Sequence, residues 1–370
     1  MNNFVIKEIN TDNILKELEN IGFDKTYRQK ACDKYKYKNL KIFDLTLPQA
    51  NILKQTALSY GADCAVHREV LTSSIEKTDV ILGGSISQLK KICEKLKQQP
   101  FSLKVLAEKI LEGFIVQKQK TKLVGILNLT PDSFSNDGIM DSKNAQKKIY
   151  ELIEQGADMI DIGPESTRPF SKNIDSQEQI ERLKLIVNEF HKINIPISID
   201  TRSSEVAKFA LDNGANFIND VSGGIFDSKM FEVISEYNAG VIIQHSLNRA
   251  EERISYNNVI DDVFKDLLEK LQKAKEKNIT KIILDPGIGF GKSRSENIEI
   301  LDNIEDFYSL NYPIMVGISR KSFLGLSDSE NNELKDTLTL AYSYPLIRKK
   351  VDFLRVHNVK LHRQLLDSVI

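Results

Sequence analysis

The repeated alternation of two sequence patterns constrains the fold of this chain more than any other feature. Beginning at residue 123, short apolar runs rich in β-branched residues alternate eight times with segments whose apolar residues recur every three or four positions. The first run spans residues 123–129 and the last spans residues 351–358. Buried parallel strands that are covered by helices give this pattern. Eight such units close into a (β/α)8 TIM barrel of ~250 residues, and residues 121–370 supply 250.

Residues 1–120 do not continue this alternation. Strand-like runs at residues 4–9, 40–45 and 80–82 are interspersed with helical patterns, the first of which follows Thr11 as a helix N-cap. We therefore expect a small α/β N-terminal domain of unknown role over residues 1–120, followed by the barrel over residues 121–370. Lysines and aromatic residues interleave over residues 34–41, as in some nucleic-acid-binding segments. Because the whole chain is nearly neutral, we interpret this stretch as a solvated loop and strand face.

The composition excludes several classes of protein. Lys plus Arg (51) and Asp plus Glu (52) almost cancel, so neither nucleic acid nor an anionic membrane is an expected partner. The three cysteines, Cys32, Cys64 and Cys93, lack C-x-x-C spacing and are interpreted as reduced thiols. The first residues do not resemble a signal peptide, and no run of 18 apolar residues occurs. We expect a cytoplasmic protein.

Polar side chains follow the apolar runs at nearly every strand end. In a barrel of this kind, the carboxyl ends of the strands and the loops after them carry the functional groups. The candidates at these positions are Asn128, Asp161, Glu165, Thr167, Arg168, Asp200, Asn219, Asp220, Gln244, His245, Asp285, Ser319, Arg320, Lys321, Ser322, Arg355, His357 and Asn358. Buried carboxylates without partners are costly, so this clustering predicts a polar ligand site.

The residue types at the strand ends indicate the kind of ligand. The cationic group consists of Arg168, Lys321, Arg355 and His357. Guanidinium groups suit phosphate oxygens, so these side chains predict an anion such as phosphate or diphosphate. The acceptor group consists of Asp200, Asn219 and Asp285. Because a carboxylate can accept two parallel N–H bonds, we expect a flat nitrogen heterocycle that carries a phosphate or diphosphate.

Other motifs in the barrel do not support a different chemistry. Residues 287–293 resemble a phosphate-binding loop, but Pro286 occupies the position where the Walker motif requires its first glycine. We interpret this segment as a tight, close-approach loop after the sixth strand. His245 and His357 each lie alone on a strand, which argues against a dedicated transition-metal site. The barrel contains no cysteine, and no Ser-His-Asp set is evident.

The motifs GILNLTPDSFSNDG, DIGPESTRP, ISIDT, INDVSGG, DPGIGFGK, GISRKSFLG and RVHNV together resemble the dihydropteroate synthase family. The resemblance covers essentially all of residues 121–370, with each motif at the expected strand end. It implies condensation of 4-aminobenzoate with (7,8-dihydropterin-6-yl)methyl diphosphate, which yields 7,8-dihydropteroate and diphosphate in folate biosynthesis. The N-terminal segment resembles extensions of some bacterial members. The resemblance also implies a homodimer as a possible assembly.

The same resemblance implies a role for each matching residue. The pterin-binding set is Asp200, Asn219, Asp285 and Lys321. The diphosphate-side set is Thr167, Arg168, Arg355 and His357. The 4-aminobenzoate-side set is Phe134, Pro169, Phe290 and Ser322. Asn128 is expected to help ligate the Mg²⁺ that accompanies the diphosphate. A helix that follows the seventh strand would also point its N-terminal N–H groups at an anion near Ser322.

Three positions depart from the pattern of the family. Gln244 replaces a methionine, Pro164 replaces a glycine, and Asn358 replaces the aspartate that commonly follows the final histidine. These changes could affect pterin packing, loop mobility and the orientation of His357, respectively.

Two alternative functions remain open at this point. A methyltransferase of the same pterin-binding barrel class moves a methyl group from a reduced folate to a corrinoid, but such enzymes generally lack the TPDSF and SRKS segments found here. A non-catalytic pterin-binding homologue is the second alternative. The retained Lys321, Arg355 and His357 argue against it.

Overall fold

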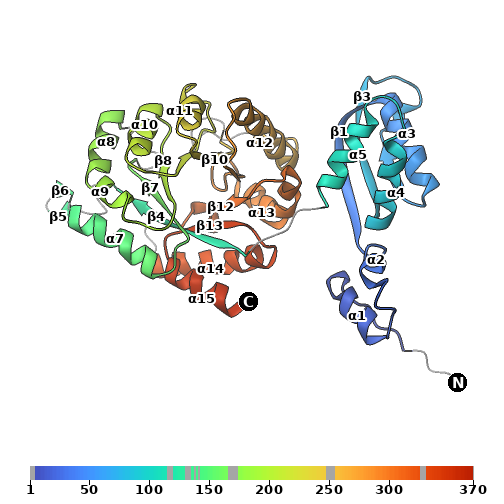
Figure 1. Cartoon of the computed structure of the whole chain (residues 1–370), viewed down its shortest axis with the longest axis horizontal. Coiled ribbons are helices and arrows are strands. Elements are labelled where there is room, and N and C mark those ends of the chain that lie inside the picture. Colours follow the sequence, from blue (N-terminus) through green and yellow to red (C-terminus); the bar gives the residue numbers. More distant parts are fainter. Residues whose placement is uncertain are drawn as a thin grey trace. The chain divides into compact units, whose positions relative to one another are not determined.

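The computed structural model describes residues 5–114, 120–129, 135–136, 139–140, 142–165, 174–246, 255–325 and 331–369. The chain divides into two compact units, Met1–Val116 and Gln117–Ile370, which Figure 1 shows in blue-green and in green to red. The assignment of catalysis to the barrel domain, residues 121–370, remains a prediction.

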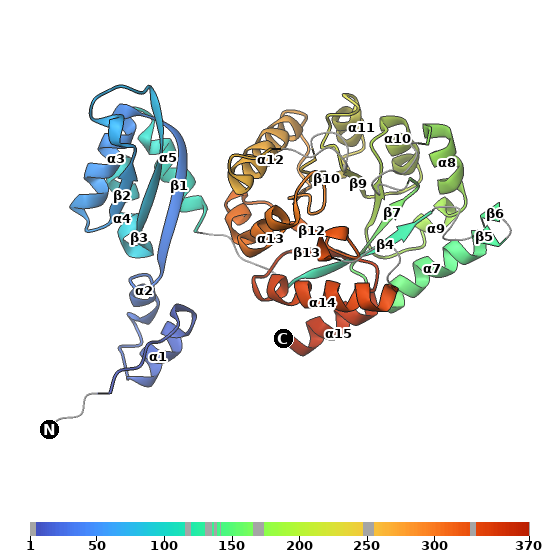
Figure 2. The same cartoon turned by 180° about the vertical axis from the view of Figure 1, so that it is seen from behind.

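The N-terminal unit is a small α/β fold. Its strands β1 (Tyr37–Thr46), β2 (Asp63–Val66) and β3 (Lys77–Ser85) form an antiparallel sheet in the order β1-β3-β2. Helices α3 (Leu47–Ser59), α4 (Ile86–Leu96) and α5 (Leu103–Glu112) pack with this sheet (Figure 2). Alternate residues of β3, such as Val80 and Leu82, are buried against the helices, whereas Ile81 between them is exposed. One face of the sheet is therefore covered.

The segment before this sheet corrects one prediction. The strand predicted for residues 4–9 is absent from the described residues 5–9, where Val5 and Ile6 are 94% and 92% exposed. No strand of the described residues covers these side chains, so β-propensity alone does not produce a strand there. Short helices follow at α1 (Ile14–Asn20) and α2 (Arg28–Cys32).

The second unit is the predicted (β/α)8 barrel. Its sheet runs in the order β11-β10-β9-β8-β7-β4-β13-β12, and the neighbouring strands are parallel. The strands are β4 (Lys122–Asn128), β7 (Met159–Gly163), β8 (Ile197–Asp200), β9 (Phe217–Asp220), β10 (Gly240–Gln244), β11 (Ile282–Asp285), β12 (Met315–Val316) and β13 (Phe353–Val356). A single parallel bridge between Leu284 and Ile314 joins the two edges, so the barrel is nearly closed.

Helices cover the outside of the barrel (Figure 1). They are α7 (Ser142–Glu154), α8 (Ser176–Lys184), α9 (Val187–Phe190), α10 (Ser204–Asp212), α11 (Met230–Glu236), α12 (Val259–Glu276), α13 (Arg294–Asp302), α14 (Asn332–Arg348) and α15 (Val359–Val369). The main hydrophobic core lies between these helices and the outward side chains of the strands. Short strands β5 (Ser135–Asn136) and β6 (Ile139–Met140) pair after β4. Within the described ranges, no helix is both long and apolar enough to cross a membrane.

The inner face of the barrel changes from apolar to polar along the strands. Near the strand starts, one cluster contains Val124, Met159, Ile242, Ile283 and Met315, with Phe217 and Phe353 packed against it. Because side chains alternate between the two faces of a strand, residues two positions further also point inward. Those positions include Asp161, Asn219, Gln244, Asp285 and Arg355. The barrel therefore has an apolar floor and a polar mouth.

Candidate active site

The centre of the barrel mouth is a bridge between Arg355 and two carboxylates. The Arg355 Nε–H donates to Oδ2 of Asp161 at 2.6 Å, and an Nη2–H donates to Oδ2 of Asp200 at 2.8 Å. Asn219 donates from Nδ2 to the same Asp161 oxygen at 3.0 Å. Burial raises the pKa of Asp200 to about 7, although the charge of Arg355 opposes this shift. The sequence interpretation placed Asp161 at the site without giving it a role, and the structure makes it a partner of both Arg355 and Asn219.

Several buried polar atoms around this bridge have no hydrogen-bond partner among the described residues. They are Asp161 Oδ1, Asp200 Oδ1, Asn219 Oδ1, Ser198 Oγ and Gln244 Nε2. A buried polar atom left unpaired costs about 1–3 kcal/mol, so such a cluster indicates a ligand that completes the bonds. Three of the atoms are carboxylate or amide oxygens that accept, one is a hydroxyl that can donate or accept, and one is an amide nitrogen. A heterocycle with several N–H groups and at least one acceptor matches this set.

Asp285 and Lys321 form a second part of the mouth. Oδ1 of Asp285, whose residue is 2% exposed, accepts a hydrogen bond from the Gly287 N–H at 2.7 Å. Burial raises the pKa of Asp285, and the charge of Lys321 opposes the shift. Burial also disfavours the charged form of Lys321, and this lowers the pKa of its ammonium group to about 8. The Lys321 ammonium lies 4.6 Å from the centre of the Phe290 ring, in range of a cation–π contact.

The loop after β11 approaches its neighbours very closely, as the sequence predicted. Gly287 has a φ of +69°, and a Cβ atom there would lie 2.0 Å from the carbonyl oxygen of His245. A Cβ atom on Gly289 would lie 2.9 Å from Cδ of Lys321. Lys292 donates to the carbonyl oxygens of Gly287 and Phe290 at 2.9 and 3.2 Å. The glycines therefore let the loop pass close to the His245 backbone and to the Lys321 side chain.

His357 is held by the end of the neighbouring strand. Its Nδ1 and the Oγ of Ser319 are 2.9 Å apart, and its backbone N–H donates to the same oxygen at 3.1 Å. The sequence placed Ser319 at a strand end but gave it no role. Since Arg355 and His357 are two residues apart, both belong to the inward set of positions.

The contacts of Asn358 explain why this chain has an asparagine where the family pattern has an aspartate. Its Nδ2 donates to Oδ2 of Asp336 at 3.0 Å, and Asp336 accepts two further bonds from Arg320 at 2.7 and 2.9 Å. Oδ1 of Asn358 accepts from the Leu361 N–H at 3.1 Å, near the start of α15. An aspartate at this position would face the Asp336 carboxylate. The asparagine therefore suits an acidic neighbour on α14.

The remaining predicted residues have different outcomes. Ser322 begins the 3-10 turn η4 (Ser322–Leu324), so the helix predicted after the seventh strand is a turn of only three residues, and α14 starts ten residues later. A Gly325 at φ +81° ends the turn, because a left-handed residue cannot continue a helix. Asn128 ends β4 and is partly exposed. The other four, Phe134, Thr167, Arg168 and Pro169, lie outside the described residues.

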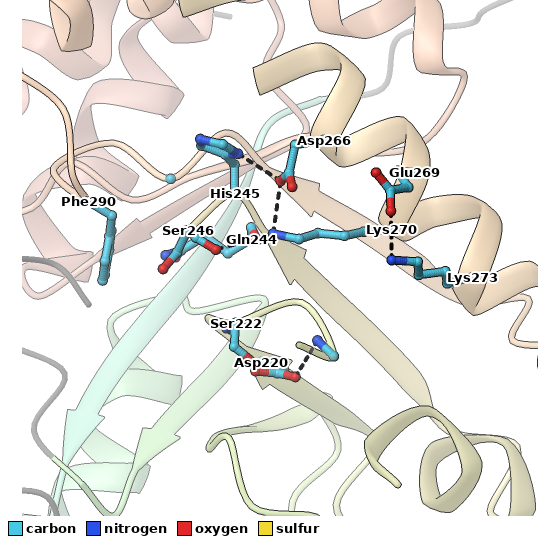
Figure 3. Close-up of polar contacts among 12 residues, drawn as sticks. Asp220, Ser222, Gln244, His245, Ser246, Asp266, Glu269, Lys270, Lys273 and Phe290 are labelled. Carbon is cyan, nitrogen blue, oxygen red and sulfur yellow. Dashed lines mark hydrogen bonds and ion pairs between the residues drawn. The ribbon is translucent and has the colours of Figure 1, made fainter. Parts of the chain in front are cut away.

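A second buried polar network lies behind β10, as Figure 3 shows. Nδ1 of His245 lies 2.7 Å from Oδ2 of Asp266, and its Nε2 lies 3.1 Å from the Tyr256 hydroxyl. Lys270 pairs with the same Asp266 oxygen at 2.8 Å. Burial lowers the pKa of His245 to about 4, so the ring is neutral at pH 7. His245 therefore points away from the mouth and belongs to the scaffold.

The fold and site together define a (β/α)8 barrel protein with a buried polar site at the carboxyl ends of its strands, whose unpartnered atoms suit a nitrogen heterocycle. The family model described as pterin binding enzyme matches residues 124–357. A bifunctional dihydropteroate synthase/dihydropteroate reductase of Helicobacter pylori is 33% identical over 373 residues, covering 98% of this chain and 97% of that protein. A dihydropteroate synthase of Clostridium beijerinckii is 41% identical over 246 residues, which cover 65% of this chain and 90% of the relative.

A solved structure gives the same result. The dihydropteroate synthase of Clostridium difficile, determined in the presence of pteroic acid, matches with a TM-score of 0.64 and 34% identity, covering 69% of this chain and 99% of that one. The chain belongs to the pterin binding enzyme family, and within it to the dihydropteroate synthases.

Proposed function

We infer that this chain condenses 4-aminobenzoate with (7,8-dihydropterin-6-yl)methyl diphosphate, giving 7,8-dihydropteroate and diphosphate for folate biosynthesis. Membership of the family supports the reaction. The observation that carries the substrate assignment is the cluster of unpartnered buried atoms on Asp161, Asp200, Asn219 and Gln244. A pterin ring offers both N–H donors and acceptor atoms along its edges, so it can complete these bonds.

In this proposal the pterin ring lies against Asp200, Asn219, Asp285 and Lys321. The amine of 4-aminobenzoate is mostly unprotonated at neutral pH, so its attack on the pterin methylene needs little help from a general base. Diphosphate leaves as the carbon–oxygen bond breaks, and the electron-rich dihydropterin stabilises positive charge at the methylene. The buried carboxylates of Asp161 and Asp200 favour that charge. The protein mainly positions the substrates and neutralises the leaving group.

The diphosphate side is assigned to Arg355 and His357, together with Thr167 and Arg168. Arg355 supports this assignment because it sits at the mouth with its guanidinium already oriented by two carboxylates. The 4-aminobenzoate side is assigned to Phe290 and Ser322, with Phe134 and Pro169 from the loops.

Magnesium is the proposed cofactor, with Asn128 as its protein ligand. A Cβ atom on Gly163 would lie 3.2 Å from Oδ1 of Asn128 and 3.9 Å from Cβ of Asp200, so the amide oxygen lies beside the proposed pterin site. Over the described residues, no cluster of three or more His, Cys, Asp or Glu side chains could hold a metal. Mg²⁺ commonly keeps several waters and binds one or two protein oxygens plus substrate phosphates. Asn128 fits that role, in which Mg²⁺ would neutralise charge on the diphosphate.

An assay of diphosphate release from the purified chain, with and without 4-aminobenzoate, tests the reaction. We expect release with the pterin diphosphate that depends on 4-aminobenzoate. Binding of the pterin without turnover would instead indicate the non-catalytic homologue. Methyl transfer from a reduced folate to a corrinoid, without diphosphate release, would indicate the methyltransferase. Sedimentation of the same sample tests the homodimer, which remains a prediction, as does the cytoplasmic location.

A second activity is favoured by the relative from Helicobacter pylori, whose name includes dihydropteroate reductase. That match covers 98% of this chain and therefore includes the N-terminal unit, which the shorter synthases lack. We propose that the full chain also reduces dihydropteroate, by transfer of a hydride from a nicotinamide or reduced flavin donor and of a proton from solvent. The test compares the full chain with residues 118–370, using chromatography to separate dihydropteroate from tetrahydropteroate. Reduction by the full chain but not by residues 118–370 would show that the reductase activity requires the N-terminal unit. Absence of reduction by both proteins would contradict the proposed second activity.

A further inference from the structure

Gln244 places a buried amide in the mouth of the barrel. It ends β10 and lies two residues after Ile242, which belongs to the apolar cluster inside the barrel. Side chains two positions apart on a strand share a face, so Gln244 points inward as Ile242 does. Its Cα pairs in register with that of Asp285 on β11. Gln244 therefore lies next to a proposed pterin-binding residue.

The amide of Gln244 differs chemically from the other groups in the mouth. The residue is only 5% exposed, and its Nε2 has no hydrogen-bond partner among the described residues. The unpartnered atoms of Asp161, Asp200 and Asn219 are oxygens, which accept hydrogen bonds from a ligand. Gln244 Nε2 is the nitrogen of that set, and it can only donate. A ligand that satisfies the whole set must therefore carry an acceptor opposite Gln244.

The backbone at Gln244 is held firmly in place. The buried Lys270 ammonium donates to the carbonyl oxygens of Gln244 and Ser246 at 3.1 and 3.3 Å, and pairs with Asp266 at 2.8 Å. Figure 3 shows the Lys270 side chain reaching from α12 to the end of β10. On the other side, a Cβ atom on Gly287 would lie 3.3 Å from Cγ of Gln244. The Lys270 bonds therefore hold the backbone of Gln244, and the side-chain stem passes close to Gly287.

We propose that Gln244 is a specificity-determining residue whose Nε2–H donates a hydrogen bond to an acceptor atom of the bound pterin ring. This inference rests on the proposed function, because it takes the ligand of the mouth to be a pterin. A methionine in this position would fill a similar volume but could not donate. Gln244 thus adds a polar contact that distinguishes a pterin from a ring of the same shape without an acceptor at that edge.

The first test measures binding of 6-hydroxymethyl-7,8-dihydropterin to the full chain by calorimetry, without 4-aminobenzoate. Gln244→Met should bind about tenfold more weakly, because the ring acceptor loses its partner. The ligand-free variant should have a Tm at least as high as the wild type, since an unpaired buried donor is removed. Gln272→Met is the matched control, because Gln272 is exposed on α12. It should change neither quantity.

Gln244→Glu separates hydrogen bonding from packing. The carboxylate has the same shape but only accepts, whereas the protonated carboxyl can donate again. The ratio of its Kd to the wild-type Kd should therefore fall as the pH is lowered from 8 to 5.5. A pH-independent ratio would assign Gln244 to packing and overturn the proposal, even if Gln244→Met folds poorly.

Asp285→Asn distinguishes failure of the inference from failure of the proposed function. If both Gln244 variants bind the pterin as tightly as the wild type while Asp285→Asn binds weakly, the inference is wrong and the pterin site stands. If the wild type does not bind the pterin, the proposed function and the inference fail together.

Discussion

Arg355 and Asp161 are 194 residues apart in the chain, yet the Nε–H of Arg355 donates to Oδ2 of Asp161 at 2.6 Å. The same guanidinium also reaches Asp200 at 2.8 Å. The side chains of Arg355, Asp161 and Asp200 are 15%, 0% and 3% exposed, so solvent screens the charges weakly. Arg355 therefore contributes to the stability of the barrel as well as to the proposed diphosphate site.

Replacement of Arg355 by alanine should destabilise the protein. It would leave two buried carboxylates without their cation, and breaking a buried ion pair in this way costs about 3–5 kcal/mol. The free energy of unfolding, measured by urea denaturation at pH 7.5, should fall by that amount. Arg355→Lys keeps the charge but cannot bridge both carboxylates, so its loss should be smaller. Equal losses in the two variants would show that the retained positive charge contributes nothing without the bridging geometry.

Asp285→Asn should weaken pterin binding while the fold remains intact. Asparagine can accept one N–H of the heterocycle, but its own N–H groups then face another donor. An unpaired donor costs about 1–3 kcal/mol, which corresponds to roughly ten- to a hundredfold in affinity. Calorimetry with 6-hydroxymethyl-7,8-dihydropterin measures the change, and circular dichroism checks the fold. Unchanged affinity would remove Asp285 from the pterin edge.

His245 should make the stability of the protein depend on pH. Burial lowers its pKa from 6.5 to about 4 in the folded state, although the bond to Asp266 opposes the shift. Between these values the unfolded chain binds more protons than the folded protein, so stability falls as the pH decreases through this range. The contribution of His245 should lose on the order of 3 kcal/mol between pH 7 and pH 4.

His245→Asn tests this pH dependence, because asparagine can still donate to Asp266 but does not titrate. Its unfolding free energy should decrease less steeply below pH 6.5 than that of the wild type. Burial also lowers the pKa of His362, which adds the same slope to both proteins. Parallel curves would mean that His245 titrates normally in the folded protein.

Lys270 and Lys273 provide a matched pair on α12. The Lys270 side chain is 2% exposed and pairs with Asp266, whereas Lys273 is 56% exposed and pairs with Glu269 at 2.7 Å (Figure 3). Lys270→Met should cost about 3–5 kcal/mol of unfolding free energy, because Asp266 and two carbonyl groups lose their cation. Lys273→Met should cost less than about 1 kcal/mol, as surface ion pairs do. Similar losses for both variants would contradict the structural role of Lys270.

The sequence predicted the barrel because the patterns that indicate strands and helices depend only on residues close together in the chain. Each apolar run and each helical segment records which of its own residues are buried, and this periodicity does not depend on distant contacts. The rule that functional groups follow the strands then placed Asp200, Asn219, Asp285 and Arg355 at one end. The same local information failed at residues 5–9, where the apolar residues have no neighbouring strand within the described ranges, and at Ser322, where a left-handed Gly325 stops the turn.

The amino-acid sequence by itself thus determined the order of the strands and the end of the barrel at which the polar residues gather. Only the tertiary structure decided which of these residues pair. Arg355 meets Asp161 and Asp200 because closure of the barrel brings the last strand beside the first, while His245 bonds to Asp266 because it points outward. Gln244 points inward instead, and its Nε2 has no hydrogen-bond partner in the described part of the chain. Pairing between distant residues depends on sheet register and barrel closure, and a local pattern contains neither.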